Sequence, residues 1–255
     1  MASAEARYHN ELLGKKVVFA HGQKVYWVEE VFKNNPRIEK EPKHGQQIVR
    51  IENYPGKRPY IKLVTKERFY WNERFVAEPG EVWLDDEEKK LGIPGAVIVE
   101  PNVKAKSPFS MNKAWPWERW QTLVKSLDLP WVQLVHSDVP RLKGVKHVEA
   151  TFREALSHIN LASLVVTTDG AFHHAAAALR KPAVVLWGGL VSPLILGYKG
   201  HKNIWHGAES CGTVGECDHC KQAMASIEVD EVKEAIEERT RHLATGSRNP
   251  SPAVC

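Results

Sequence analysis

The second half of the chain alternates apolar runs with segments in which apolar residues recur every three or four positions. Continuous apolar runs predict buried strands at 96–99, 131–135, 164–166 and 183–187. Helical periodicity, a capping box formed by Thr151 and Glu154, and an alanine-rich stretch predict helices at 116–127, 151–159, 171–179 and from Asp230 onward. Strands that alternate with helices form βαβ units, so we predict a parallel sheet whose ligands bind beyond the carboxyl ends of its strands.

The first 92 residues contain shorter and less regular segments. An apolar run at 17–20 predicts a buried strand that leads into His21, and the spacing of apolar residues predicts a helix at 25–32. Short strands are expected at 47–51, 60–64 and 80–84, and a charged run at 85–90 is expected to face solvent. We place a domain boundary after this run. The predicted organisation is a small α/β domain at 1–92, a second α/β domain at 93–243 and a flexible polar tail at 244–255.

Composition and charge narrow the class of protein only slightly. Hydrophobic residues make up 43% of the 255 residues, enough for a sizeable core, and the formal charge of +4 neither requires nor excludes a nucleic-acid partner. No apolar stretch approaches the roughly 18–20 residues that a membrane-spanning helix needs. Residues 1–16 are charged and lack the apolar centre of a secretory signal, so we expect a cytoplasmic protein without a transmembrane segment.

A predicted strand, a glycine and a helix start meet at Thr168-Asp169-Gly170. The first turn of the following helix directs free backbone N–H groups and a positive dipole end toward the ligand-binding edge, which favours phosphate. The alternative is an ordinary strand-to-helix turn in which Asp169 only caps the helix.

A second candidate for phosphate binding is the loop between the strand at 96–99 and the helix at 116–127. Lys104, Lys106 and Lys113 lie in this loop. A lysine just before a helix N-terminus supplies a mobile point charge that suits a diphosphate. The alternative is a basic loop that is simply exposed to solvent.

Three blocks of sequence occur in a distinctive order: Lys113-Ala114-Trp115-Pro116 with Trp120, then residues 168–177, then residues 181–189. Together they resemble the heptosyltransferase-type glycosyltransferases, glycosyltransferase family 9, over about residues 95–240. The resemblance implies an α/β protein of GT-B-like architecture. Its two lobes are Rossmann-like, the N-terminal lobe is reduced here, and the C-terminal lobe binds a nucleotide-sugar donor.

The same resemblance implies roles for individual residues. Lys113 contacts the donor phosphates, Asp169 and His174 act in catalysis, and the turn between them surrounds the diphosphate and the sugar. The other residues that the resemblance places at the donor are Thr168, Gly170, Ala171, Phe172, His173, Gly188 and Gly189.

Two positions depart from the family pattern. The usual turn Asp-Thr-Gly-Pro-Met-His is replaced by Asp169-Gly170-Ala171-Phe172-His173-His174, which removes a hydroxyl that could bind phosphate. The first strand usually leads into Gly-Asp, whose Asp is the expected general base, whereas this chain has Gly22-Gln23. An amide cannot take a proton, so either another residue serves or activity is lost. His21 is our substitute base, since imidazole titrates near neutral pH, and a loop histidine bonded to backbone is the alternative.

Three of the four cysteines, Cys211, Cys217 and Cys220, cluster around His219. Three thiolates and a histidine can hold a structural zinc, but the five residues between the first two cysteines exceed the usual spacing. The alternative is a group of reduced, packed thiols. By the family resemblance, the transfer reaction itself requires no cofactor.

The predicted function is a glycosyltransferase that moves a sugar from a nucleotide-diphosphate sugar to a hydroxyl. Family analogy implies an inverting, metal-independent reaction and an envelope saccharide as acceptor. Residues 66–75 place aromatic residues between basic ones, which also suits a nucleic-acid acceptor, as in phage enzymes that glycosylate hydroxymethylated bases. The alternatives for these aromatic residues are to stack on sugars or to fill a core. A further alternative is a degenerate protein that binds the nucleotide sugar without turnover, because the usual base is missing.

Overall fold

The computed structural model describes residues 2–21, 24–25, 27–41, 44–52, 54–103, 107–136 and 139–244. Gly22, Gln23, Lys104, Lys106 and the predicted tail beyond residue 244 lie outside the described residues. Residue 244 itself is the last residue of helix α9 (Val229–Ala244). Within the described part of the chain, no helix combines the length and the apolar character that crossing a bilayer demands.

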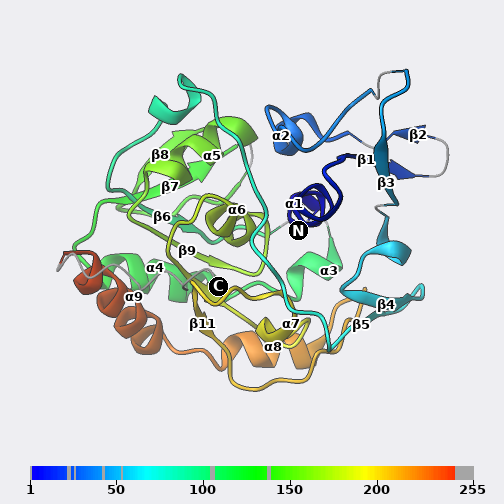
Figure 1. Cartoon of the computed structure of the whole chain (residues 1–255). Coiled ribbons are helices and arrows are strands. Elements are labelled where there is room, and N and C mark those ends of the chain that lie inside the picture. Colours follow the sequence, from blue (N-terminus) through cyan, green and yellow to red (C-terminus); the bar gives the residue numbers. More distant parts are fainter. Residues whose placement is uncertain are drawn as a thin grey trace.

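A six-stranded parallel sheet forms the centre of the second half of the chain (Figure 1). Its strands are β6 (Val97–Glu100), β7 (Trp131–Val135), β8 (Lys146–Glu149), β9 (Leu164–Thr168), β10 (Ala183–Leu186) and β11 (Lys202–Ile204). The predicted α/β class with a parallel sheet is therefore confirmed, and the edge strands β8 and β11 are additions to it. The order β8-β7-β6-β9-β10-β11 is the doubly wound order, which reverses between β6 and β9. Sheets of this kind bind ligands at that switch point, beyond the carboxyl ends of the strands.

Helices cover both faces of this sheet, because strands buried on two sides are apolar on both. Leu123 of α4 (Trp117–Ser126) and Ile236 of α9 belong to the core on one face. Leu156 of α5 (Phe152–Leu161) and Ala176 of α6 (Ala171–Ala178) belong to the core on the other. Three further helices follow β6, β10 and β11, namely α3 (Pro108–Met111), α7 (Pro193–Leu196) and α8 (Asp218–Ala225). The predicted capping box at the start of α5 is present, whereas Asp230 lies inside the first turn of α9 instead of capping it.

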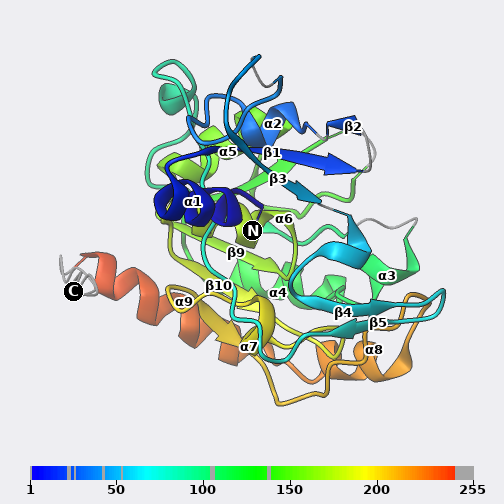
Figure 2. The ribbon, with the colours of Figure 1, turned by 45° about the vertical axis from the view of Figure 1, so that its right-hand side comes forward.

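The first part of the chain forms a separate three-stranded sheet, in the order β2-β1-β3, and a hairpin of β4 and β5. Its elements are α1 (Ala2–Leu13), β1 (Lys16–His21), β2 (Lys24–Val25), α2 (Glu29–Phe32), β3 (Ile48–Glu52), the 3-10 turn η1 (Pro55–Lys57), β4 (Ile61–Val64), β5 (Phe69–Trp71) and the 3-10 turn η2 (Glu88–Lys90). Ala6 of α1 packs with Val17 and Phe32 in a hydrophobic core that is separate from the cores of the large sheet. Both views place α1 between β1 and α6 (Figures 1 and 2).

The boundary near residue 92 stays a prediction. The small and the large sheet share no strand. However, Ile61, Trp71 and Leu84 belong to a core cluster of the large sheet, and Trp71 Nε1 donates a hydrogen bond of 2.9 Å to the carbonyl oxygen of Leu190. The hairpin and the segment after it therefore pack as an extension of the second half.

Three local predictions for the first part are wrong. The expected helix at 25–32 is the short strand β2 followed by the single turn α2. Residues 80–84 form no strand, because the backbone N–H of Glu81 donates to Ser3 Oγ of α1 and its carboxylate pairs with Arg37. In the charged run at 85–90, Glu88 is buried and pairs with Arg153 of α5.

Candidate active site

Asp169 and Lys113 form an ion pair at the switch point of the large sheet. Asp169 follows β9 directly, and Lys113 lies just after α3. Lys113 Nζ is 3.4 Å from Asp169 Oδ2, with 18% and 9% of the two side chains exposed. Because Gly170 is the N-cap residue of α6, Asp169 is available to Lys113 and does not cap the helix. The two phosphate-binding candidates, which are far apart in sequence, thus lie side by side.

His173 fixes the conformation of the turn after Asp169. Its Nδ1 accepts a hydrogen bond of 3.0 Å from the Gly170 N–H, so the proton of the neutral ring is on Nε2. That proton is donated to the Leu196 carbonyl oxygen, with a separation of 3.3 Å. Burial lowers the pKa of His173, which favours this neutral form. With both ring nitrogens occupied, His173 positions the turn.

The rest of the turn leaves the start of α6 open. Thr168 is buried at the end of β9, Phe172 is half-buried and Ala171 is exposed. The φ of Gly170 is 175°, an extended conformation, and a Cβ there would meet only the Thr168 carbonyl oxygen, at 3.9 Å. The backbone therefore does not itself require glycine. The first N–H groups of α6 have no partner within the helix.

His174 links the turn to a cavity. Its Nδ1 lies 2.8 Å from the hydroxyl oxygen of Tyr198. Its ring centroid is 3.9 Å from that of His173. Burial, and then the neighbouring His173, lower the pKa of His174 well below its usual value, so the ring is neutral at pH 7. A neutral imidazole can accept a proton.

The cavity has a volume of about 570 Å³ and opens between elements from both parts of the chain. Its lining comes from α1, from the segments 58–60 and 75–78, and from His174. The residues with aromatic or ionisable side chains among them are Glu5, Tyr8, His9, Arg58, Tyr60, Phe75, Glu78 and His174. Burial raises the pKa of Tyr60, and the Asp169 carboxylate adds to the rise, so this wall lies within electrostatic reach of Asp169. The sequence pattern gave no sign of this cavity. Only the helix-forming composition of residues 2–6 could have indicated α1 itself.

Glu100 is a second carboxylate at the switch point. It ends β6 and pairs in register with Thr167 of β9. Burial raises its pKa to about 7, although its Oε1 accepts a hydrogen bond of 2.7 Å from the Asn102 N–H. The rule that selected Asp169, a polar residue at the carboxyl end of a buried strand, could also have selected Glu100.

His21 is not joined to these residues. It ends β1, is exposed, and stacks on Tyr54 with a centroid separation of 4.9 Å. Among the described residues, no hydrogen bond, ion pair or ring contact links His21 to Asp169 or His174. Its role as a base stays a prediction.

Gly188 and Gly189 lie where the loop after β10 meets α8. A Cβ on Gly188 would come within 2.7 Å of Met224 Cγ, and one on Gly189 within 2.4 Å of His219 Cε1. The close approach of α8 thus explains both glycines, and it couples this loop to the cysteine cluster.

The aromatic residues of the basic segment 66–75 are mostly part of the core. Trp71 is buried, and Phe69 stacks on it with a centroid separation of 5.7 Å. Phe75 is partly buried against the same core, while Tyr70 is 44% exposed. A surface for stacking several bases is therefore not formed by this segment.

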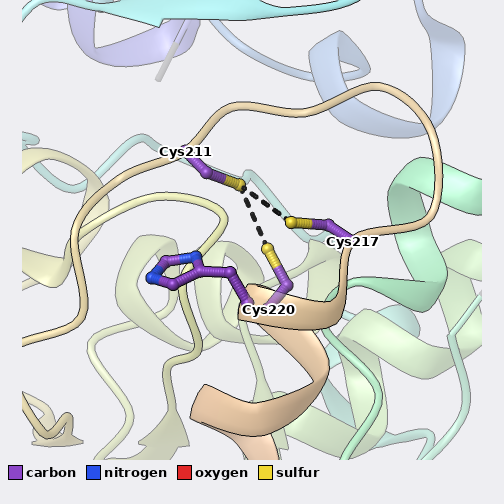
Figure 3. A group of neighbouring side chains, drawn as sticks. Cys211, Cys217 and Cys220 are labelled. Carbon is purple, nitrogen blue, oxygen red and sulfur yellow. Dashed lines mark hydrogen bonds between the residues drawn. The ribbon is translucent and has the colours of Figure 1, made fainter.

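The three clustered cysteines come together in space (Figure 3). Cys211 Sγ lies 3.7 Å from Cys217 Sγ and 3.2 Å from Cys220 Sγ, and no disulfide joins them. Ligand atoms of these cysteines and of His219 all lie within 4.8 Å of one another. The predicted set of three thiols and a histidine is thus arranged as one possible metal site.

No protein-family model matches the chain, and no curated protein matches its sequence. Solved glycosyltransferases do match its fold. The family 9 glycosyl transferase from Veillonella parvula DSM 2008 has a TM-score of 0.60 at 12% identity, over 94% of this chain and 93% of that chain. The dodecameric, iron-containing heptosyltransferase TibC from enterotoxigenic E. coli, in complex with ADP-D-beta-D-heptose, has a TM-score of 0.57 at 11% identity, over 96% and 75%.

A third match is the E. coli ADP-heptose LPS heptosyltransferase II, with a TM-score of 0.50 at 19% identity, over 65% of this chain and 54% of that chain. The chain spans about half the length of that enzyme and of the E. coli heptosyltransferase WaaC. These matches show the fold: the chain has the heptosyltransferase-like, GT-B-type fold of glycosyltransferase family 9.

Proposed function

We propose that the protein transfers a sugar from a nucleotide-diphosphate sugar to a hydroxyl group of a saccharide, with inversion at the anomeric carbon. The observation that carries this proposal is the Lys113–Asp169 pair, which lies at the start of α6 and beside a cavity lined by His174. Such a transfer uses four groups: a positive charge, a carboxylate, a helix N-terminus and a neutral imidazole. The fold shared with family 9 glycosyltransferases supports the same conclusion.

The donor diphosphate binds at the N-terminus of α6 in this proposal. The free N–H groups of Ala171 and Phe172 face its oxygens, and Lys113 turns from Asp169 to the phosphate charge. The missing Cβ of Gly170 leaves room for a phosphate group. Thr168 and His173 hold the turn, and the loop of Gly188 and Gly189 borders the site. Asp169 then accepts hydrogen bonds from the sugar hydroxyls.

The acceptor binds in the 570 Å³ cavity, which suits a saccharide. Tyr8, Tyr60 and Phe75 offer ring faces, and Arg58 and Glu78 offer hydrogen-bonding groups around them. A base takes the proton of the acceptor hydroxyl while its oxygen attacks the anomeric carbon. The bond from that carbon to the diphosphate breaks, and the nucleoside diphosphate leaves with the electron pair. Lys113 and the dipole of α6 stabilise the charge of the leaving group.

His174 is the base that the geometry favours, because it lines the cavity beside the turn. His21 is the base that the sequence suggests, in place of the missing Asp. We propose that transfer needs no added metal ion, since Lys113 and α6 already supply positive charge. TibC is an iron-containing heptosyltransferase bound to ADP-heptose, so ADP-heptose is the first donor to test.

The test is a transfer assay with the purified protein, ADP-, UDP- and GDP-sugars, and lipopolysaccharide-type saccharide acceptors, without added divalent cations. We expect product with at least one donor. His174→Ala should abolish transfer if His174 is the base, whereas loss of transfer in His21→Ala alone would assign the base to His21. Donor binding without any turnover or hydrolysis would instead support the degenerate binding protein.

A further inference from the structure

The cluster of Cys211, Cys217, His219 and Cys220 adjoins the loop of Gly188 and Gly189, and the proposed reaction does not use its side chains. Its four ligand atoms lie within 4.8 Å of one another. Three come from thiols and one from an imidazole, the donor types that select zinc or iron in tetrahedral sites. We propose that this cluster binds one tetrahedral transition-metal ion, zinc or iron, as a closed structural site.

The distances between the sulfur atoms fit such an ion. A tetrahedral ion with metal–sulfur bonds of about 2.3 Å places its ligand sulfurs about 3.8 Å apart. Cys211 Sγ is 3.7 Å from Cys217 Sγ and 3.2 Å from Cys220 Sγ. A small outward movement of Cys220 Sγ is enough to reach the metal geometry. Figure 3 shows the three thiols converging on one point.

The fold explains why the long spacing between Cys211 and Cys217 is not an obstacle. Cys217 is the N-cap residue of α8 and Cys220 lies in its first turn, so these two form a short pair at a helix start. Cys211 comes from the opposite side, out of the preceding loop. The spacing rule for a single metal-binding hairpin therefore does not apply to it.

The loop that carries Cys211 is held in place independently of any metal. The Cys211 N–H donates a hydrogen bond of 2.8 Å to the Gly189 carbonyl oxygen. The Gly212 N–H donates one of 3.0 Å to the carbonyl oxygen of Leu190. From the other side, the Phe69 N–H of β5 donates a hydrogen bond of 2.8 Å to the Gly212 carbonyl oxygen. The Thr213 N–H points at Cys211 Sγ with a separation of 3.5 Å. Backbone hydrogen bonds to the loop after β10 and to β5 thus fix the position of the Cys211 thiol.

His219 completes the set from the same helix turn. A Cβ on Gly189 would lie 2.5 Å from His219 Nδ1, so the absence of a side chain at Gly189 makes room for this ring. Four protein ligands leave no position for a substrate or water, which is the arrangement of a structural and not a catalytic site. An ion here would join the loop before α8 to α8 itself.

The test begins with the metal content of the full chain, purified reduced and without a histidine tag. Elemental analysis should give about one zinc or iron ion per chain. After metal removal and loading with Co²⁺, the protein should show the strong visible absorption of tetrahedral cobalt bound to thiolates. Absorption of the protein as purified separates the two metals, because iron–thiolate sites are coloured and zinc sites are not.

Variants then assign the ligands. Cys217→Ser and His219→Ala should each reduce the bound metal to below about one tenth, whereas His219→Cys should retain it with a shifted cobalt spectrum. Since His219 is exposed, the His219 pair remains informative if the cysteine variants fail to fold. Cys255→Ser, which alters the fourth cysteine, and His206→Ala, whose ring bonds Ser226 and Glu231, are matched controls that should leave the metal content unchanged.

Three results would overturn the proposal. One is protein without bound metal that also gives no tetrahedral cobalt spectrum. Another is a disulfide between Cys211 and Cys220 in protein purified with reductant. The third is loss of metal in His174→Ala instead of the cysteine variants, since Asp169, His173 and His174 also lie together. None of these readouts depends on glycosyl transfer, so this proposal and the proposed function stand or fall separately.

Discussion

At the scale of single residues, the site depends on how Asp169 divides its contacts. One carboxylate oxygen lies 3.4 Å from Lys113 Nζ, and the other lies 3.6 Å from His173 Nδ1. His173 is held neutral by burial and by the Gly170 N–H, so Lys113 is the charged partner. A phosphate that approaches Lys113 competes with Asp169 for the same ammonium group.

Lys113→Ala is expected to weaken the binding of a nucleoside diphosphate by about tenfold to a hundredfold, the effect of losing one charged hydrogen bond. Binding of the free nucleoside should be unchanged, because the ammonium group meets phosphate and not base. Calorimetric titration of both ligands measures the difference, with the exposed Lys125→Ala as control. Equal losses for the two ligands would mean that Lys113 supports the fold only.

Glu100 gives a pH-dependent prediction. Its pKa is raised to about 7 in the folded protein against 4.5 in the unfolded chain, so ionisation opposes folding. The contribution of Glu100 to stability therefore falls as the pH rises from about 4.5 to about 7, and is constant above that. Glu100→Gln should raise the melting temperature at pH 8 and have little effect at pH 5. The exposed Glu73→Gln should change neither value, and an equal effect of Glu100→Gln at both pH values would contradict the assignment.

At the scale of elements, η2 and α5 are joined by charge. Arg153 Nε donates a hydrogen bond of 2.9 Å to Glu88 Oε1, and a second nitrogen of the same guanidinium group contacts Glu88 Oε2. Lys33 Nζ lies 3.0 Å from Glu88 Oε1. These hydrogen bonds, that of Arg153 foremost, lower the pKa of Glu88 to about 2. Because Lys33 follows α2 directly, the contact also ties the small sheet to the large one.

Glu88→Gln is expected to lower the free energy of unfolding by about 1.5–3 kcal/mol at pH 7. The folded pKa lies below the unfolded value of 4.5, so the stabilisation is complete above pH 4.5 and is lost as the pH falls toward 2. Urea denaturation of both proteins at pH 7 and pH 3 measures this. Glu87→Gln, whose side chain is 86% exposed, is the control. A difference that is as large at pH 3 as at pH 7 would show that the pair does not act through charge.

The elements that the sequence predicted well are those with a strong local signal. β6, β7, β9 and β10 are short apolar runs, α4 and α5 have an apolar stripe, and α5 also has a capping box. The elements that it missed lack such a signal. The edge strands β8 and β11 are mostly polar, each with a lysine, and α1 is largely polar. Residues 80–84 end in the apolar run Val82-Trp83-Leu84, which predicted a strand, but the backbone N–H of Glu81 bonds to Ser3 of α1.

At the scale of the whole molecule, the turn from Asp169 to His174 was predictable and its surroundings were not. The turn follows from one strand, one glycine and one helix start. The cavity is built by α1, by residues 58–60 and 75–78, and by His174, and no local pattern connects these segments. His174, in α6 directly after the turn, is the residue that joins this cavity to the end of β9.

The proposed reaction requires that both Asp169 and His174 act on the substrate. Its most direct test is to measure specific transfer activity and melting temperature together for Asp169→Asn and His174→Ala, with His206→Ala as control. We predict that each of the first two variants loses most of its transfer while its melting temperature shifts only slightly, because the turn is held by His173. Normal specific activity of the folded protein, combined with a stability loss of about 1 kcal/mol as expected for a structural turn residue, would contradict the account.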